Sequence, residues 1–381
     1  MAVVILIPTF QRPETLPWSL QSVLLQDTSE IDSNEEIRIV ILNNDLFTKH
    51  LVEDAVKKTS DIFRKNYCKN ITIVHRDPPL LGVYNFYKGL AEYTRDGDIA
   101  LLHGDDDIMH PGALVKRYLA ARESKSAFNI AKTNGKMFFF KKDRNIYINN
   151  KDKIFDRDVS SKWRWATEED LVEYSLPFVS AYSYKIGPEF WACYEQAKKW
   201  ADALPLEPKI RLPFLPFYMG VSAWINEQLV VIPETLVRRG QLLQSRGLLP
   251  PRVVTEYANT GIILQTGLAV LNGEKLGSIA EINGIRNSVR KAAAAHLIFS
   301  LFRRDGVSFS QLKDLYRLTK MQWWSRDLLF KIIFSSSSTI IKNVCGLNHL
   351  RNRLSGWGHR LSPEEFWILW KASYKHQGRQ Y

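Results

Sequence analysis

The sequence predicts an α/β protein with a doubly wound, mostly parallel sheet and a mainly helical C-terminal region. Short aliphatic runs rich in Val and Ile alternate with stretches of helical periodicity in the first third of the chain. Each run ends in polar or turn-forming residues, and beyond residue 240 helical patterns dominate. A chain of 381 residues, 45% hydrophobic and 24% charged, is long enough to bury such a core.

Four apolar runs are typical of buried strands: Ala2–Ile7, Ile37–Leu42, Ile71–His75 and Asp98–His103. Helical spacing of apolar residues predicts the helices between and after them: Pro13–Gln26, His50–Lys65, Val83–Arg95 and Ile108–Ala121. Strands that alternate with helices at this spacing require crossover connections. The sheet is therefore expected to be mostly parallel.

The later part of the chain is less regular. The charged stretch Phe138–Val159 is expected to form a hairpin or a loop, and Leu229–Ile232 before Pro233 to form a late strand. We expect a first domain over 1–240, which divides into halves over about 1–120 and 121–240. The basic, mainly helical region then covers 241–381.

Polar residues follow all four strands of the first half: Thr9–Gln11, Asn43–Asp45, Arg76–Asp77 and Asp105–Asp107. Ligands of open α/β sheets bind outside the carboxyl ends of parallel strands. We therefore expect these four segments to converge on one site.

Asp105–Asp107 is the strongest chemical signal among them. Adjacent carboxylates repel and raise one another's pKa, and a hard cation such as Mg²⁺ or Mn²⁺ relieves that repulsion. The alternative is an acidic cluster at the N-terminus of the helix that follows, where Pro111 suits the first turn. Spacing alone leaves both interpretations open.

The other polar segments have equally plain alternatives. Asp45 suits the imide N–H of a uracil ring, although an Asx turn is the commoner role of such a residue. Gly82 and Asn85 open a helix whose N–H groups suit an anion. Arg12 suits a phosphate, and a solvated arginine is the alternative.

Taken together, these motifs resemble glycosyltransferase family 2. Four segments in order carry the resemblance: residues 7–26 as the family's opening, Asn43–Asp45 at its nucleobase position, Gly82–Leu90 as its Gly/Asn helix, and Leu101–Asp107 with Pro111 as its metal motif. The Gly-Asp-Asp-Asp form is most similar to an abequosyltransferase-like subgroup that builds bacterial surface polysaccharides. The resemblance covers residues 2–120 and returns weakly at Val230–Val237.

The resemblance implies a GT-A fold and a metal-dependent, inverting transfer of a sugar from a nucleotide-diphosphate donor to a glycan or lipid-linked glycan. Residues 1–240 would then be the catalytic domain, with the nucleotide-sugar half over about 1–120 and the acceptor half over about 121–240. The implied metal is Mn²⁺ or Mg²⁺, with Asp106 as its ligand and Asp107 supporting the metal shell. Asp105 would contact the ribose or sugar of the donor. The remaining residues of the implied nucleotide-sugar site are Thr9, Phe10, Arg12, Asn44, Asp45, Gly82 and Asn85.

Two departures from the family pattern concern the site. Gly104 stands where the wider family has an acidic residue, and no clear Glu-Asp pair precedes the late strand. An inverting transfer needs one carboxylate to take the proton of the acceptor hydroxyl. The candidates for this base are Glu207, Asp202, Glu189 and Glu195, each of which also suits an ordinary surface position. A non-catalytic scaffold that binds glycan or membrane is therefore the alternative function.

The net charge of +12 comes entirely from the C-terminal quarter. Ile285–Tyr381 holds 17 Lys and Arg against 5 Asp and Glu, which leaves the rest of the chain neutral. Basic helical stretches with Trp and Leu predict docking on a membrane surface, whereas a helical appendage packed on the catalytic domain or a second subunit is the alternative. Nucleic acid is not expected, because no binding motif accompanies the charge.

Cellular context follows from what the sequence lacks. Cys68, Cys193 and Cys345 are far apart, which favours a reducing compartment without structural zinc. Neither a secretory signal nor a membrane-spanning run is recognisable. We expect a cytoplasmic protein that attaches peripherally to the inner face of the membrane. The sequence is also compatible with a homo-oligomer.

Overall fold

The computed structural model describes residues 1–62, 70–80, 82–140, 146–148, 162–167, 170, 179–202, 215–243 and 359–375. The chain divides into two compact units, and the first consists of Met1–Lys198, Leu215–Arg246 and Gly358–Tyr381. All described residues except 199–202 belong to this first unit. The fold below is that of the first unit.

The four strands predicted in the first half form the parallel part of the sheet. They are β1 (Ala2–Thr9), β2 (Glu36–Asn43), β3 (Ile71–His75) and β4 (Ile99–Leu102), in the spatial order β4-β1-β2-β3. All three neighbouring pairs are parallel. The predicted α/β class with a mostly parallel central sheet is therefore confirmed.

Antiparallel strands extend the sheet beyond β4. β9 (Tyr182–Lys185) pairs antiparallel with β4 and with β6 (Phe128–Phe140), and β10 (Leu229–Leu243) runs parallel to β6. Shorter strands complete the described sheet: β5 (Ile108–Met109), β7 (Ile146–Ile148), β8 (Arg164–Trp165) and β11 (His359–Leu361). The antiparallel β9 thus joins the parallel strands to the second half of the unit.

The late strand is longer than predicted. It was expected to stop at Pro233, but β10 passes through a register shift between Ile232 and Thr235 and continues to Leu243. A bulge accommodates a residue that cannot donate to the ladder, so proline does not end the strand here. Gly240, where the domain boundary is expected, lies inside β10, and residues 244–358 lie outside the described residues.

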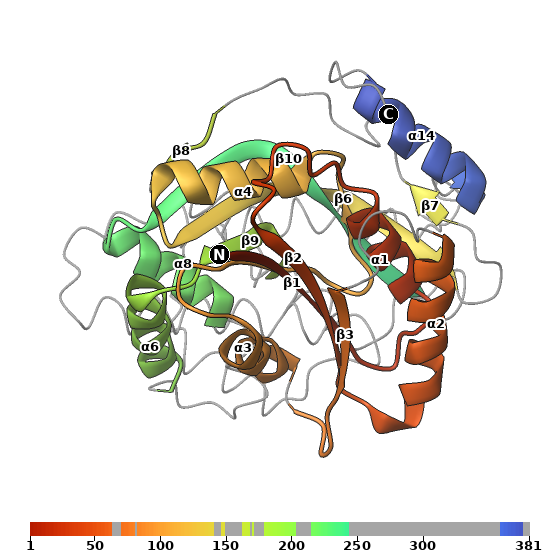
Figure 1. The fold of residues 1–381 in the computed structure, drawn as a ribbon, viewed down its shortest axis with the longest axis horizontal. Coiled ribbons are helices and arrows are strands. Elements are labelled where there is room, and N and C mark those ends of the chain that lie inside the picture. Colours follow the sequence, from red (N-terminus) through yellow and green to blue (C-terminus); the bar gives the residue numbers. More distant parts are fainter. Residues whose placement is uncertain are drawn as a thin grey trace, which may run out of the picture. The chain divides into compact units, whose positions relative to one another are not determined.

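Helices cover both faces of the sheet (Figure 1). α1 (Leu16–Leu24), α2 (Lys49–Ile62) and α4 (Ala113–Ser124) supply buried side chains to a core on one face. The opposite face carries α3 (Gly82–Tyr93) and α6 (Pro188–Asp202), and α8 (Leu215–Ile225) packs against Tyr182 there. This two-sided arrangement is the doubly wound architecture that the sequence predicts.

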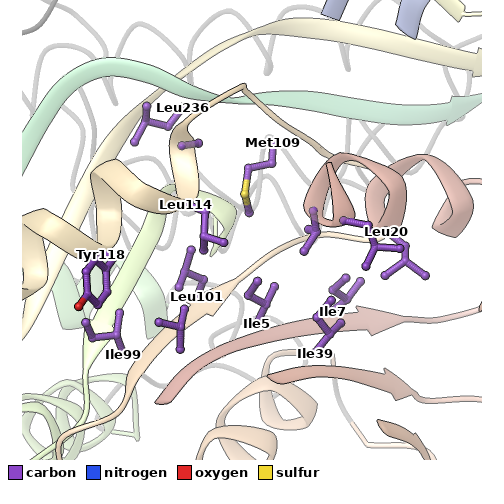
Figure 2. Close-up of a cluster of buried hydrophobic side chains, with 14 of the residues drawn as sticks. Ile5, Ile7, Leu20, Ile39, Ile99, Leu101, Met109, Leu114, Tyr118 and Leu236 are labelled. Atoms are coloured by element: carbon purple, nitrogen blue, oxygen red, sulfur yellow. The ribbon is translucent and has the colours of Figure 1, made fainter. Parts of the chain in front are cut away.

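The core between the sheet and α1, α2 and α4 is built from alternate strand residues (Figure 2). Ile5 and Ile7 of β1, Ile39 of β2 and Leu101 of β4 point into it, with Leu114 of α4. Val3 through Ile7 are fully buried on both faces, as expected for a central parallel strand. Each fully buried aliphatic side chain contributes about 1.5–3 kcal/mol to folding.

The helix expected over Ile108–Ala121 starts later than predicted. Ile108 and Met109 form β5 and pair with Arg238 and Val237 of β10. Gly112 then takes a left-handed conformation at φ 73°, and α4 begins at Ala113. The long-range pairing with β10 overrides the local helical pattern.

The C-terminal helix α14 (Pro363–Lys375) packs on the N-terminal part of the unit. Trp367 stacks on Trp18 of α1 at 5.7 Å between ring centroids, and the Trp370 indole N–H donates to the Met109 carbonyl at 3.0 Å. Phe366 and Trp370 are fully buried. At least this helix of the basic C-terminal region is thus part of the folded unit that holds the sheet.

Candidate functional site

The carboxyl ends of β1, β2 and β4 lie side by side, as the sequence predicts. Thr9 and Asn43 are partners in the β1–β2 ladder, and the Asn44 N–H donates to the Thr9 carbonyl at 2.9 Å. The His103 N–H donates to the Leu6 carbonyl at 2.9 Å and extends the β1–β4 pairing up to the acidic residues. The segments after Thr9, Asn43 and His103 therefore share one edge of the sheet.

The loop Gly104–Asp107, which we call the acidic loop, contains two carboxylates that face Arg12. The Arg12 guanidinium forms an ion pair with Asp106 and lies 3.6 Å from Asp105 Oδ1. The Asp106 side chain is 16% exposed, whereas Asp105 is buried. Asp106 is thus the carboxylate of the pair that a ligand reaches first.

Burial disfavours the charge of all three carboxylates. It raises the pKa of Asp105 to about 7, with Arg12 opposing the rise and Asp106 adding to it. Burial also raises the pKa of Asp106, and together with the charge of Asp106 it raises the pKa of Asp107 to about 7. The charge of Arg239 also opposes the rise at Asp106 and Asp107, yet the two guanidinium groups do not fully compensate this much negative charge.

Asp107 is held by protein groups on both carboxylate oxygens. Oδ2 accepts from the Ser180 hydroxyl at 2.6 Å, and Oδ1 accepts from the Gly240 N–H at 3.0 Å. A Cβ on Gly104 would collide with the Asp107 carboxylate. Glycine is therefore required where the wider family has an acidic residue, because Asp107 folds back over that position.

A neutral histidine lies under the acidic loop. His103 is fully buried, and burial, reinforced by the charge of Arg117, lowers its pKa to about 3. Neither ring nitrogen of His103 has a hydrogen-bond partner among the described residues. The floor of the loop thus carries no additional positive charge from this residue.

The residues at the expected nucleobase position have clear local roles. The Asn44 side chain bonds both the N–H and the carbonyl of Leu80, at 2.7 and 2.6 Å. Asp45 caps the short 3-10 helix Leu46–Thr48 by accepting from the Phe47 N–H at 3.0 Å. Asp45 thus forms a local cap and Asn44 holds the segment that leads to α3, and the contact of Asp45 with a nucleobase stays a prediction.

Two aromatic rings are exposed at the same edge. Phe10 directly follows β1 and is 47% exposed, and Phe47 follows the cap residue Asp45 and is 90% exposed. Exposed rings of this size are uncommon at a solvated loop and suit stacking against a flat ligand. They therefore provide apolar surface beside the polar ends of β1 and β2.

Asn85 and Gly82 differ in their surroundings. Asn85 is buried, donates to the Leu42 carbonyl at 3.0 Å and accepts from Arg76 Nε at 3.3 Å. A Cβ on Gly82 would meet nothing within 4 Å. Asn85 thus fixes α3 to β2 and orients Arg76, whereas protein packing does not require a glycine at position 82.

The structure separates a predicted base from the acidic loop. Glu189 is exposed in the first turn of α6, shortly after Ile186, whose N–H bonds the Asp98 carbonyl at 2.8 Å. Asp98 lies at the start of β4 and the acidic loop at its end, so Glu189 belongs to the opposite edge of the sheet. Glu195 and Asp202 are exposed farther along α6, and Glu207 lies outside the described residues. The base stays a prediction.

Three groups of the site carried no signal in the sequence. Ser180 reaches the acidic loop from the 3-10 helix Val179–Ala181, Gly240 reaches it from β10, and Arg117 of α4 bonds the Ser180 carbonyl at 2.7 Å. All three are distant from the loop in sequence or point back to it from a helix. Only the tertiary structure brings them together.

The residues present fit a divalent cation bound together with a phosphate ligand. Asp105 Oδ2 is buried and without a hydrogen-bond partner among the described residues, and Asp106 beside it is partly exposed. Within the described ranges no cluster of three His, Cys, Asp or Glu side chains forms a complete metal cage. Mg²⁺ and Mn²⁺ are commonly held by one or two carboxylates plus substrate phosphates, so two carboxylates suffice.

Comparison with protein families shows what this part of the chain is similar to. Residues 4–170, which are less than half of the chain, match the family model of glycosyl transferase family 2. The matched segment includes most of β1, the Asn43–Asp45 segment, α3 and the whole acidic loop. The edge of the sheet described above therefore lies inside the segment that is similar to this family.

Solved structures of low sequence identity were also found. TarS residues 1–349 of S. aureus in complex with UDP-GlcNAc is 11% identical, with 84% of this chain and 79% of that chain covered and a TM-score of 0.45. The mannosyltransferase PcManGT of Pyrobaculum calidifontis in complex with GDP-Man and Mn²⁺ is 11% identical, with 87% of each chain covered and a TM-score of 0.46. No curated protein sequence matches significantly. In the described part of the chain, no helix has the length and apolar character needed to cross a membrane.

Proposed function

We propose that this chain is a metal-dependent glycosyltransferase that moves a sugar from a nucleotide-diphosphate donor to a glycan or a lipid-linked glycan. The observation that carries the proposal is the acidic loop beside Arg12, at the carboxyl end of β4, in a segment that matches the glycosyl transferase family 2 model. An abequosyltransferase-like role in surface polysaccharide synthesis, with inversion at the anomeric carbon, is the finer form of this proposal.

The donor lies along the edge formed by β1, β2 and β4. Asp106 binds the metal, and Asp105 faces the ribose or sugar. Asp107 supports these two residues, because hydrogen bonds from Ser180 and Gly240 hold its own carboxylate in place. When bound, the metal neutralises charge on the departing diphosphate. Arg12 supplies a second positive charge on a partly exposed side chain within reach of that diphosphate.

The nucleoside lies on the β1–β2 side of this edge. Thr9, Phe10 and the Asn44–Asp45 segment are adjacent there, with Gly82 and Asn85 at the start of α3. Phe10 and Phe47 offer ring faces to the base. The open space at Gly82 leaves room for a phosphate near the N-terminus of α3.

The acceptor reaches the site at a membrane surface. The basic excess of Ile285–Tyr381 suits anionic headgroups, and an acceptor carried on lipid would be concentrated there. A helical appendage whose charges remain in solvent is the alternative, and α14 packs on the unit in the way such an appendage does.

The proposal predicts that Asp106→Asn removes donor turnover while the protein stays folded. Asparagine keeps the size of the side chain but removes the charge that holds the metal, so turnover should fall by at least about 100-fold. The measurement is sugar release from UDP- and GDP-sugars by the full-length chain with Mn²⁺, with thermal unfolding as the folding control.

A non-catalytic scaffold gives different results. Its wild type would neither hydrolyse a donor nor gain thermal stability from Mn²⁺ with UDP or GDP, because a ligand stabilises a protein only by binding its folded state. Near-normal turnover in Asp106→Asn would equally overturn the assignment of the metal ligand.

A further inference from the structure

Ser180 connects two ends of the acidic loop through one hydroxyl group. The Gly104 N–H donates to Ser180 Oγ at 2.7 Å, and Ser180 Oγ donates to Asp107 Oδ2 at 2.6 Å. A serine hydroxyl has a single proton, so the donation to Asp107 leaves its lone pairs to accept from Gly104. The side chain is fully buried, and water does not replace either bond at low cost.

The loop is closed around this hydroxyl. The Asp107 N–H donates to the Gly104 carbonyl at 3.2 Å, and the Ser19 hydroxyl donates to the same carbonyl at 2.7 Å. The Gly240 N–H holds the remaining oxygen of Asp107. Asp105 and Asp106 lie between two residues that are fixed by hydrogen bonds, and the direction of their side chains depends on these anchors.

Arg117 fixes Ser180 from the other side. Its guanidinium is fully buried and donates to the carbonyls of Ser180 and Tyr182, at 2.7 and 3.4 Å. Burial lowers the pKa of Arg117 to about 10, because the surrounding protein solvates the cation poorly. Arg117 Nε has no hydrogen-bond partner among the described residues, so the carbonyls of Ser180 and Tyr182 are the acceptors that offset the cost of burying this cation. The two carbonyls are thereby held in defined positions.

We infer that Ser180 is a positioning residue for the acidic loop, fixed in place by Arg117, and that it sets the direction of Asp105 and Asp106, and through Asp106 the metal affinity, without contacting the metal. The inference rests on the proposed function, because the direction of these carboxylates matters for a metal–nucleotide ligand. Removal of the hydroxyl leaves the Gly104 N–H and Asp107 Oδ2 unpaired in a buried site. The loop then relaxes, and the two carboxylates lose their common orientation.

The test compares two serine-to-alanine variants of the full-length chain. Ser180→Ala removes the bridging hydroxyl. Ser183→Ala, three positions along, removes a hydroxyl that is equally buried but has no hydrogen-bond partner among the described residues. Mn²⁺ is titrated by electron paramagnetic resonance, alone and with UDP or GDP. Ser180→Ala should bind Mn²⁺ about 10–100-fold more weakly than wild type, and Ser183→Ala should bind it normally.

A second readout separates positioning from general stability. A merely structural role would lower the unfolding midpoint of Ser180→Ala and leave its Mn²⁺ affinity unchanged, and that result overturns the inference. Where Ser180→Ala does not fold, Ser180→Cys keeps the size of the side chain with a weaker donor. Its Mn²⁺ affinity should be reduced, and full affinity in Ser180→Cys contradicts the inference.

Failure of the proposed function has its own signature. Wild type that binds Mn²⁺ under none of these conditions overturns the glycosyltransferase proposal, and the positioning inference falls with it. If wild type binds Mn²⁺ and Ser180→Ala binds it with equal affinity, only the positioning inference is overturned.

Discussion

Arg12 occupies the place of a cation among the carboxylates of the acidic loop. It pairs with Asp106 and approaches Asp105 at 3.6 Å, while its own side chain is 41% exposed. An arginine forms equally good hydrogen bonds with a phosphate, so a bound diphosphate offers it an alternative partner. Under the proposed function, Arg12 and a divalent metal therefore compete for Asp106 until a nucleotide draws Arg12 away.

This competition predicts the behaviour of Arg12→Gln. Without nucleotide, the variant should bind Mn²⁺ about tenfold more tightly, because a charge-assisted hydrogen bond of about 1.5 kcal/mol no longer opposes the metal. With Mn²⁺ present, it should bind UDP or GDP more weakly. Isothermal titration calorimetry measures both affinities.

Arg38→Gln is the matched control. Arg38 forms a similar ion pair with Asp98, at 2.7 Å, near the opposite end of β4. Its loss should leave Mn²⁺ binding unchanged. Equal Mn²⁺ affinities in Arg12→Gln and wild type would show that Arg12 does not compete with the metal.

At the scale of elements, α3 depends on one glycine for its packing and not on the other. A Cβ on Gly89 would lie 2.5 Å from Leu42 Cδ1 and 3.3 Å from Leu6 Cδ2, whereas a Cβ on Gly82 would meet nothing within 4 Å. Leu6 and Leu42 belong to the central strands β1 and β2, which are buried on both faces and have no room to shift. Gly89 thus sets how closely α3 approaches the sheet.

Substitution of each glycine by alanine tests this difference in packing. Gly89→Ala should lower the free energy of unfolding by about 1–3 kcal/mol through overpacking. Gly82→Ala should leave it unchanged or raise it slightly, because alanine favours the helix. Chemical denaturation measures both. A destabilised Gly82→Ala would contradict the open surroundings of that residue.

At the scale of the whole molecule, the C-terminal helix α14 packs on the N-terminal part of the chain, beside the residues that follow the acidic loop. Trp370 of α14 is fully buried and donates to the carbonyl of Met109, two residues after the acidic loop. Trp367 stacks on Trp18 of α1, close to the start of the chain. The C-terminal helix thus stabilises the core from which the acidic loop emerges.

Trp370→Ala should therefore lower the free energy of unfolding by about 3–5 kcal/mol, through the cavity and the unpaired carbonyl of Met109. Ile368→Ala changes a residue of the same helix that is 66% exposed, and it should shift the unfolding curve little. Thermal or urea unfolding measures the difference. Equal stabilities of the two variants would mean that α14 does not contribute to the folded unit.

Local patterns were sufficient for the parallel half of the fold. The runs Ala2–Ile7 and Ile37–Leu42 are apolar on both faces because helices cover both sides of a parallel strand, and that composition is visible in sequence. The polar residues after these strands share an edge because parallel strands end on the same side. The placement of Arg12 and Asp105–Asp107 near one another follows from the same rule.

The antiparallel half could not be predicted in this way. Ile108 and Met109 match a helical pattern, yet they pair with β10, which lies more than a hundred residues away. Local propensity is a weak preference that such long-range pairing overrides. The continuation of β10 past Pro233 has the same origin, because its partner β6 holds it on both sides of the bulge.

The sequence by itself determined which residues carry the chemistry: an arginine after the first strand and three aspartates after the fourth. Only the tertiary structure decided how they are used, because the hydroxyl of Ser180, the N–H of Gly240 and the guanidinium of Arg117 reach the loop from other elements. The sequence decides which residues carry a carboxylate. The direction of a buried carboxylate is set by whichever donors the fold brings within hydrogen-bond distance.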